Sequence, residues 1–485
     1  MTEQRVWSGM AVMLLAGAMP GCVGIVGSSN TTPPPGTGIK QINHIIVMAQ
    51  ENRGFDHYFG AMRQYWAANG IADQPFDGLP QFNPTPGAVP TNPGCDPAFP
   101  PPSACTTDSS SPAIPSFHMV SMCVENPSPF WNEDHVDWNL SNPVSTTATL
   151  DGFAWTAAND ARNIQPPFTD TDGVRAMGHY DGTDLPYYYF MASKFATSDR
   201  WFSPLMSRTQ PNRMYLLAAT SAGHVYPLPP GASPLTNKTI FDLLQSAGVS
   251  WKIYVTDMVY ANPPVQDASL GMFTAGTTYA SNIVPVSQFM TDLQNGTLPS
   301  VSYIEPGYNS GLDEHPGEDD NAPGGSIQVG SQYVSTLVNA LMQSSSWKDS
   351  AFILTFDEFG GFYDHVPPQV AVSPDGIPPS DLKPGDTCTI TTGPTCDFTY
   401  TGYRVPLIVI SPFTKKNYVS HTVADSTATL KFIETRFGLS SLTKRDAAQM
   451  DMTEFFDFTN IPWATPPANI PTQPTNGQCY LTHLP

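Results

Sequence analysis

The chain has 485 residues and a formal net charge of -21, from 21 Lys and Arg against 42 Asp and Glu. Repulsion by this charge excludes a surface that follows a nucleic-acid backbone, although a metal ion or a helix N-terminus could still bind a compact anion. Charged residues are only 13% of the chain, and the 50 Pro and 37 Gly predict a globular fold with extensive loops.

The chain opens with the features of a secretory signal. Residues 7–19 form an apolar run after Arg5, and a polar, Pro-rich stretch follows. The run is too short for a membrane-spanning helix, so we predict a signal peptide at 1–21, a Pro- and Gly-rich linker at 22–40 and export of the protein. A buried N-terminal helix is the alternative interpretation.

The cysteines are those expected in an oxidising compartment. Residues 19–22 resemble the bacterial lipoprotein cleavage box, which leaves three locations open: periplasmic, secreted, or an outer-surface lipoprotein anchored through Cys22. The other six cysteines suit three disulfides, with free buried thiols as the alternative. Short intervening loops favour two pairs, which leaves a third: Cys95 with Cys105, Cys388 with Cys396, and Cys123 with Cys479.

Short β-rich runs alternate with helix-like stretches along the chain. The predicted strands are residues 42–49, 250–255, 300–304, 351–356 and 405–410. The predicted helices are residues 185–195, 213–219, 239–247, 332–343 and 427–437. This alternation predicts an α/β fold of three layers, α/β/α, around a mainly parallel central sheet.

Residues 61–150 interrupt this alternation with Pro-rich, weakly periodic sequence, and we expect a long loop-rich insertion or cap there. If the protein meets lipid, the aromatic residues of this insertion are the expected contacts, since exposed aromatic patches mark membrane surfaces. They are Tyr65, Trp66, Phe76, Phe82 and Phe99.

Carboxylates follow two of the predicted strands where each strand ends. Glu51 and Asn52 follow the first strand, and Asp357 and Glu358 follow another. Ligands of open α/β sheets bind at the carboxyl ends of the strands. Neighbouring buried acids need a positive partner, which a divalent cation held by these four residues would supply. The alternative is that they cap the helices that follow.

A hydroxyl precedes a helix start that contains Pro211. Thr209 lies where the backbone N–H groups and the helix dipole would bind an anion, which suits attack on a phosphoryl group. An ordinary helix cap is the alternative for Thr209.

Three histidines lie in polar, acid-flanked sequence that is typical of loops: His135, His315 and His365. Acidic neighbours favour the protonated imidazole, which can donate to phosphate oxygens or to a leaving alkoxide. For each one alone, a surface histidine is the alternative.

Residues 42–60, INHIIVMAQENRGFDHYFG, resemble the segment that opens the non-specific phospholipases C of bacteria and plants and the related bacterial acid phosphatases. These enzymes form one phosphoesterase family with an alkaline-phosphatase-like core. Further segments match in the family's order, among them WNEDHVDWN, SRTQPNRMYLLAATSAG, YIEPGYNSGLDEHP and TFDEFGGFYDHVPP. The resemblance covers about residues 41–450, which we take as the catalytic domain, followed by a Pro-rich tail at 451–485.

The resemblance implies specific site residues. The implied ligands of one divalent ion are Glu51, Asn52, Asp357 and Glu358. The implied catalytic residues are Thr209, as the nucleophile, with His135, His315 and Asp313. We expect Asn52 and His365 to bind substrate. The chain departs from the family at Gly54, Phe130, Gln210 and Phe359, which alters the pocket wall without removing an implied ligand or nucleophile.

The sequence therefore predicts an exported, metal-dependent phosphoester hydrolase of the phospholipase C type that works through a phosphothreonine intermediate. An acid phosphatase acting on soluble phosphomonoesters is the alternative, and a binding protein without turnover is a third hypothesis. The metal is left open among Ca, Mg, Mn and Zn. The expected partners are a phospholipid or a small phosphoester and, through peripheral contact or a lipid anchor, a membrane, but no nucleic acid.

Overall fold

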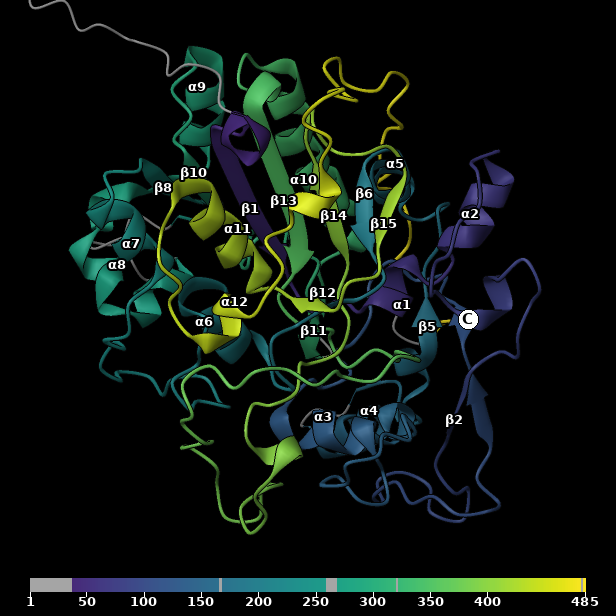
Figure 1. The fold of residues 1–485 in the computed structure, drawn as a ribbon. Coiled ribbons are helices and arrows are strands. Elements are labelled where there is room, and N and C mark those ends of the chain that lie inside the picture. Colours follow the sequence, from purple (N-terminus) through teal and green to yellow (C-terminus); the bar gives the residue numbers. More distant parts are fainter. Residues whose placement is uncertain (1–36, 165–167, 259–267, 320–321, 481–482) are drawn as a thin grey trace, which may run out of the picture. The chain divides into compact units, whose positions relative to one another are not determined.

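An eight-stranded sheet lies at the centre of the computed structural model, in the order β15-β6-β14-β13-β1-β10-β8-β9 (Figure 1). Its parallel part consists of β13 (Ser350–Phe356), β1 (His44–Gln50), β10 (Val301–Glu305), β8 (Trp251–Val255) and β9 (Ile283–Pro285). The rest is β14 (Leu407–Ile410), antiparallel to both neighbours, then β6 (Ala196–Ser198) and β15 (Tyr418–Ser420), parallel to each other. The five predicted strands and the mainly parallel sheet are confirmed.

The structure describes residues 37–164, 168–258, 268–319, 322–480 and 483–485. Residues 37–485 form one compact unit. The predicted signal peptide, Cys22 and the predicted linker as far as residue 36 lie outside the described residues.

The two central strands bring the predicted site residues to one edge. Every residue of β13 is buried, as are six of the seven residues of β1, because neighbouring strands and helices cover both faces. The two strands are parallel and in register from His44 opposite Ser350 to Gln50 opposite Phe356. The residues that follow β1 and β13 therefore leave the sheet side by side.

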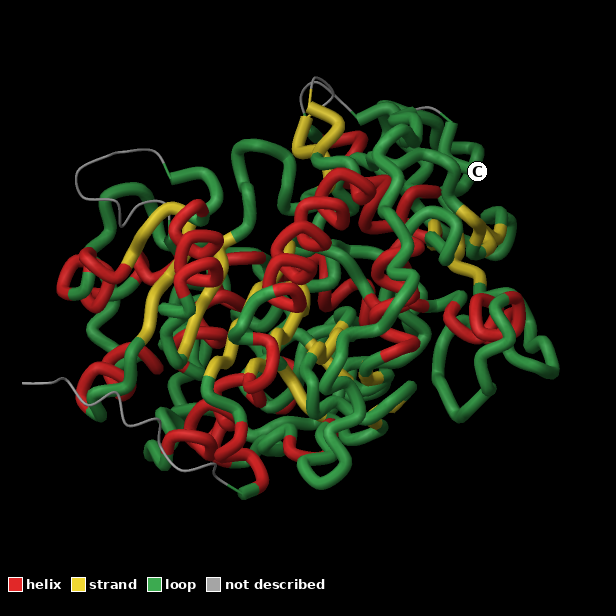
Figure 2. The backbone as a smooth tube through the Cα atoms, turned by 90° about the horizontal axis from the view of Figure 1, so that it is seen from above, coloured by secondary structure: helices red, strands yellow, loops and turns green. Residues whose placement is uncertain are grey.

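Helices cover both faces of the sheet (Figure 2). One group is α6 (Thr209–Ala218), which packs against α7 (Ile240–Ser246) and α11 (Ala428–Phe437). The other is α10 (Ile327–Gln343), which packs against α5 (Pro186–Lys194) and α9 (Ser287–Asn295). The three-layer α/β/α prediction is confirmed.

Two helices begin earlier than predicted. Helix α10 begins at Ile327 because its buried stripe of Ile327, Val334 and Val338 extends past residue 332. Helix α6 begins at Thr209 because Pro211 fits in a first helical turn, where its missing N–H costs no hydrogen bond.

The predicted insertion contains little regular structure. Its helices and those beside it are α1 (Phe55–Phe59), α2 (Met62–Ala68), α3 (Trp131–Trp138) and α4 (Phe153–Asn163). The short strands here are β2 (Thr91–Pro93), β3 (Ala113–Pro115), β4 (Phe117–His118) and β5 (Gly178–His179). The remaining short elements are β7 (Trp201–Phe202), α8 (Thr274–Thr278), β11 (Pro316–Asp319), β12 (Ala322–Gly324), β16 (Ala424–Asp425) and α12 (Lys444–Ala447).

Of the five aromatics expected to contact lipid, two are buried, Tyr65 and Phe82 are half-buried, and Phe99 is exposed. Trp66 and Phe76 are 0% and 4% exposed and contact each other within the main hydrophobic core. Tyr65 is half-buried and packs against this core, whereas Phe99 is 48% exposed. The prediction is wrong for Trp66 and Phe76, because Trp66 donates to Ser193 of α5 and Phe76 packs on Phe55 of α1.

The three predicted disulfides are confirmed. Cys95 pairs with Cys105, Cys388 with Cys396, and Cys123 with Cys479. The last bond joins the C-terminal tail to residues of the insertion. Among the described residues, no helix combines the length and the hydrophobicity needed to cross a bilayer.

Candidate active site

The residues that follow β1 and β13 are joined to each other by hydrogen bonds. Asp357 Oδ1 accepts from the backbone N–H of Asn52 at 3.2 Å and from that of Glu358 at 2.8 Å. Asn52 has a φ of 57°, a left-handed conformation that Asn tolerates better than most residues. All four predicted ligands are buried, and three of them are in direct contact.

Gly360 allows the loop after β13 to approach the loop after β1. Its N–H donates to Glu358 Oε2 at 2.6 Å, and its φ is +76°. A Cβ at this position would lie 2.0 Å from the carbonyl oxygen of Asn52. Only glycine fits this close approach, which holds Glu358 beside Asn52.

The Thr209 hydroxyl contacts the loop after β1. Its Oγ1 is 3.1 Å from Glu51 Oε2 and 3.3 Å from Asn52 Oδ1. Thr209 is the first residue of α6, and the residue in the cap position is Arg208, so the structure does not support the helix-cap alternative. The hydroxyl instead faces the predicted metal ligands.

His315 orients the Asn52 amide. His315 Nε2 lies 2.9 Å from Asn52 Nδ2, and His315 Nδ1 contacts the carbonyl oxygen of Pro316. The carbonyl requires a proton on Nδ1, so Nε2 accepts from the amide, and Asn52 Oδ1 is left facing Thr209. His315 thus belongs to the site as a residue that positions Asn52.

Arg213 supplies the positive charge that these acids need. Its guanidinium lies 2.5 Å from Glu51 Oε1, 3.2 Å from Asp357 Oδ2 and 3.5 Å from Glu305 Oε2. Sequence reasoning had missed Arg213 and Glu305. The sequence did contain a signal for Glu305. This carboxylate is the last residue of β10, just as Glu51 and Asp357 lie at the ends of β1 and β13.

Burial raises the pKa of three carboxyl groups at this edge. It raises the pKa of Asp357 well above its usual range, with Glu51 adding to the effect and Arg213 opposing it. Burial and the neighbouring Asp357 likewise raise the pKa of Glu358. Burial and Glu51 raise the pKa of Asp313 to about 7. The single positive charge of Arg213 therefore does not neutralise all of the carboxyl groups around it.

These residues fit a divalent cation. Glu358 Oε1 is buried and has no hydrogen-bond partner among the residues that the structure describes. The donors of Glu51, Asn52, Asp357 and Glu358 are all oxygen atoms, which hard divalent ions prefer. A cation there would also offset the cost of burying several acids together.

Among the described residues, His135 and His365 contact groups other than Thr209. His135 is fully buried, with its ring nitrogens 2.6 Å and 2.7 Å from the carbonyl oxygens of Trp131 and Thr395. His365 contacts Asp56 at 2.6 Å and Asp77 at 3.1 Å. For either histidine to contact the substrate, it would have to give up these partners. The predicted roles of His135 and His365 therefore stay predictions.

In the described part of the chain, two groups of side chains have ligand atoms within 4.8 Å of one another, and neither of them is the group of Glu51, Asp357 and Glu358. One is Asp56, Asp364 and His365, and the other is His118, Asp181 and Asp184. In the first group, Arg404 already lies 2.6 Å from Asp364 and 3.0 Å from Asp56, so the carboxylates have a cationic partner.

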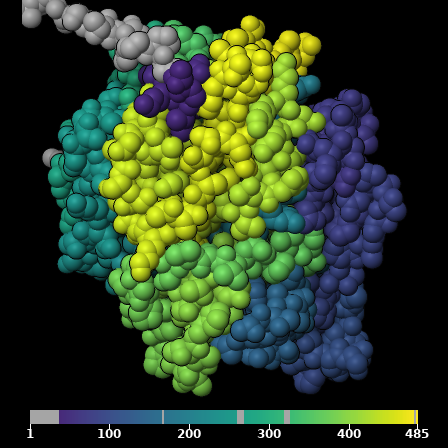
Figure 3. Space-filling view, viewed as in Figure 1, coloured from purple at the N-terminus to yellow at the C-terminus, as the bar shows by residue number. Residues whose placement is uncertain are grey.

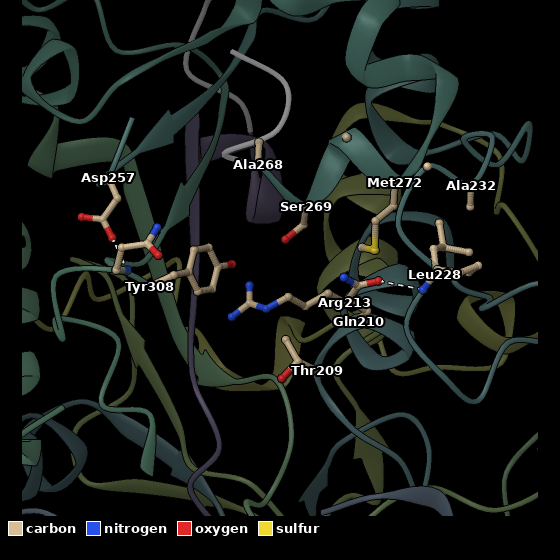
Figure 4. Close-up of a pocket in the computed structure, with 14 residues that line it drawn as sticks. Thr209, Gln210, Arg213, Leu228, Ala232, Asp257, Ala268, Ser269, Met272 and Tyr308 are labelled. Atoms are coloured by element: carbon tan, nitrogen blue, oxygen red, sulfur yellow. Dashed lines mark hydrogen bonds between the residues drawn. The ribbon is translucent and has the colours of Figure 1, made fainter. Parts of the chain in front are cut away.

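A pocket of about 620 Å³ opens beside Thr209 (Figure 4). Thr209, Gln210 and Arg213 form its wall on α6, and Gln210 Oε1 holds the backbone N–H of Leu228 at 3.0 Å. The opposite wall contains Ser269 and Tyr308, both hydrogen-bonded to Glu305. Glu305 therefore joins the pocket wall to Arg213 and the carboxylate cluster.

The fold and the site define an α/β protein with a hydroxyl and clustered acids at the carboxyl edge of its sheet, which is suited to cleaving phosphate esters. Residues 42–440 match the model of the Phosphoesterase family, so the chain belongs to this family and is a hydrolase of phosphoester bonds. It is 30% identical to phospholipase C B of Mycobacterium tuberculosis, over 100% of this chain and 90% of the relative. It is also 30% identical to non-specific phospholipase C1 of Arabidopsis thaliana, over 68% of this chain and 60% of that protein.

Among solved structures, a protein of the alkaline phosphatase superfamily from Vibrio parahaemolyticus is similar to this chain at a TM-score of 0.32. The two are 12% identical in sequence, and the match covers 55% of this chain and 64% of that chain.

Proposed function

We propose that this protein is an exported, metal-dependent hydrolase of the phospholipase C type, with Thr209 as its nucleophile. The observation that carries the proposal is the position of the Thr209 hydroxyl, 3.1 Å from Glu51 and beside a pocket of about 620 Å³. The similarity to phospholipases C over the whole chain supports the choice of substrate class.

Thr209 is held for attack on phosphorus. Its hydroxyl donates to Glu51 Oε2, which directs the oxygen lone pairs away from the sheet edge. Oγ1 forms a bond to phosphorus as the bond from phosphorus to the alcohol oxygen of the lipid breaks. The proton of the Thr209 hydroxyl passes by way of Glu51 to the released alcohol. Water then cleaves the phosphothreonine, so that the hydroxyl of the water ends on phosphorus and its other proton returns to Thr209 Oγ1.

Helix α6 contributes through its orientation. Thr209 occupies the first turn of this ten-residue helix, where the dipole is positive and backbone N–H groups lack helical partners. This end of the helix would stabilise negative charge on the phosphoryl oxygens.

The divalent ion would be held by Glu51, Asn52, Asp357 and Glu358. When bound, it would supply positive charge to the phosphoryl oxygens and to the Thr209 oxygen. Arg213 and His315 hold Glu51 and Asn52 in place for it, through the contacts already described.

A substrate panel tests the proposal. Phosphatidylcholine, para-nitrophenyl phosphorylcholine and para-nitrophenyl phosphate are each compared with and without exhaustive chelation. We expect hydrolysis of the first two, loss of both activities on chelation, and about one divalent ion per chain by metal analysis. Activity on the phosphomonoester alone would favour the acid phosphatase alternative, and full activity in metal-free protein would refute metal dependence.

Export has a separate test. We infer it from the apolar run at residues 7–19 and from the six cysteines, which all pair. The mature protein recovered from cells is expected to begin near residue 22, and lipid on Cys22 would appear as a mass increase of the N-terminal peptide. A cytosolic protein that retains residues 1–21 would contradict export.

A further inference from the structure

Arg208 carries a charged side chain next to the proposed nucleophile. It precedes Thr209 directly, in extended backbone with φ -82° and ψ -176°, and is half-buried. Its guanidinium carbon lies 4.3 Å from the centre of the Phe130 ring, at the N-terminal end of α3. Stacking on an aromatic face holds a guanidinium in one plane and leaves the N–H groups at its edges able to donate.

The guanidinium of Arg208 lacks an acceptor in the part of the chain that the structure describes: no hydrogen bond or ion pair of its side chain is found there. The two neighbouring arginines differ in this respect. Arg213 is paired with Glu51, and Arg53 donates twice to the carbonyl oxygen of Glu314. Of these three arginines, Arg208 is therefore the one whose donors are not already used by a described residue.

The Arg208 side chain stacks at the N-terminal end of α3, and its backbone directly precedes Thr209. Burial raises the pKa of Glu133 of α3, and the nearby charge of Arg208 opposes that rise. Arginine donates through a planar fork that matches two phosphate oxygens.

We propose that Arg208 is a substrate-binding residue that donates to a non-bridging oxygen of the phosphoryl group held at Thr209, with Phe130 as the residue that positions it. The inference rests on the proposed phosphoester hydrolysis and adds a residue to that site. The negatively charged phosphoryl oxygens would be the acceptors that the Arg208 N–H groups lack. Because the Phe130 ring already restricts the Arg208 side chain, less side-chain entropy is lost when phosphate binds.

Binding of inorganic phosphate tests this role without turnover. We expect Arg208→Gln to weaken phosphate binding by isothermal titration calorimetry about tenfold or more. Arg208→Lys should weaken it less, because it retains the charge but not the fork. Phe130→Leu removes the aromatic face at similar size and is expected to weaken binding about threefold. Arg63→Gln, on the distant α2 where Arg63 pairs with Asp73, is the matched control and should bind as wild type does.

Kinetics with para-nitrophenyl phosphorylcholine give the second measurement. A raised KM for Arg208→Gln, with a smaller change for Phe130→Leu and an unchanged melting temperature, would support the role. If Arg208→Gln fails to fold, the Lys and Leu variants carry the test. Phosphate affinity and KM within twofold of wild type in the Arg208 variants would overturn the inference while leaving the proposed hydrolysis intact. A wild-type protein that binds phosphate through Arg208 but cleaves no phosphoester would instead refute the proposed function alone.

Discussion

At the scale of single residues, the site depends on side chains that orient other side chains. His315 fixes the amide of Asn52, and Arg213 fixes the carboxylate of Glu51. The Thr209 hydroxyl contacts both of the residues that are held in this way. Such support keeps a reacting group within a few tenths of an ångström of its working position, which strongly affects rate.

Replacement of Thr209 is the direct test of the nucleophile. Thr209→Ala should lower turnover by several orders of magnitude and leave the melting temperature unchanged, because it removes one hydroxyl from a half-buried position. Thr209→Ser, which keeps the hydroxyl, is the matched control and should retain substantial activity. Turnover of Thr209→Ala within tenfold of wild type, in steady-state kinetics, would show that another group attacks phosphorus.

His365 is expected to make stability depend on pH. Burial alone lowers the pKa of His365, but Asp56 and Asp77 outweigh this effect and the opposing charge of Arg404, and raise the pKa to about 9. A raised pKa stabilises the fold fully below about pH 6.5, and this contribution is lost as the pH rises through about 9. His365→Gln should thus lower the free energy of unfolding by roughly 3 kcal/mol at pH 6 and by little at pH 10.

Urea unfolding at the two pH values measures the His365 effect. His421→Gln is the control, because His421 pairs with Asp199 but its side chain is 51% exposed, and exposed pairs contribute little. An equal loss of stability at both pH values for His365→Gln would mean that protonation of His365 is not the cause.

At the scale of elements, the site is made by the ends of three neighbouring parallel strands and one helix start. The loops after β1 and β13 and the end of β10 supply acids, and α6 supplies Thr209 and Arg213. Parallel strands in register end together, so residues about 300 positions apart become neighbours without any local sequence signal.

Gly360 offers a prediction for the loop after β13. Gly360→Ala should lower activity more than tenfold, because the added Cβ would collide with the Asn52 carbonyl oxygen and displace Glu358. Gly376→Ala is a matched control, since Gly376 has the same φ of +76° but a Cβ added there would meet no atom within 4 Å. It should cost about 1 kcal/mol of stability and leave activity unchanged. Equal activity of the two variants would contradict the close-approach argument.

At the scale of the whole molecule, the protein is acidic and three disulfide bonds cross-link the chain. The net charge of -21 opposes attraction to anionic bilayers, so any lipid contact would have to be apolar. Exposed aliphatic side chains occur between residues 370 and 390, which belong to the green lower surface in Figure 3. Among these, Val370 is 75% and Ile390 98% exposed.

The disulfides should differ in what they contribute to stability. Cys123 and Cys479 are 356 residues apart, whereas Cys388 and Cys396 are 8 apart. Loop-closure entropy in the unfolded chain predicts roughly 6 kcal/mol for the long loop and roughly 2.5 kcal/mol for the short one. The double serine variant of the first pair should therefore melt at a clearly lower temperature than that of the second. The opposite order, by calorimetry under oxidising conditions, would show that unfolded-chain entropy does not decide their effect.

The strands, the main helices, the family and the favoured disulfide pairs could all be predicted from the amino-acid sequence. Continuous apolar runs such as β1 and β13 are visible locally because both of their faces are buried. Site residues could also be predicted from the sequence where each lies in a recognisable segment, as Glu51, Asp357 and Thr209 do.

Which of these residues meet, and with what partners, depends on how the chain packs in three dimensions. Arg213 pairs with Glu51 across 162 positions, and the Arg208 side chain stacks on the ring of Phe130, the residue that precedes α3. The same long-range packing turned His135 toward backbone carbonyls and buried Trp66 in the core. These outcomes depend on contacts between distant segments, for which neither periodicity nor local spacing carries a signal, because burial and charge pairing are properties of the folded chain alone.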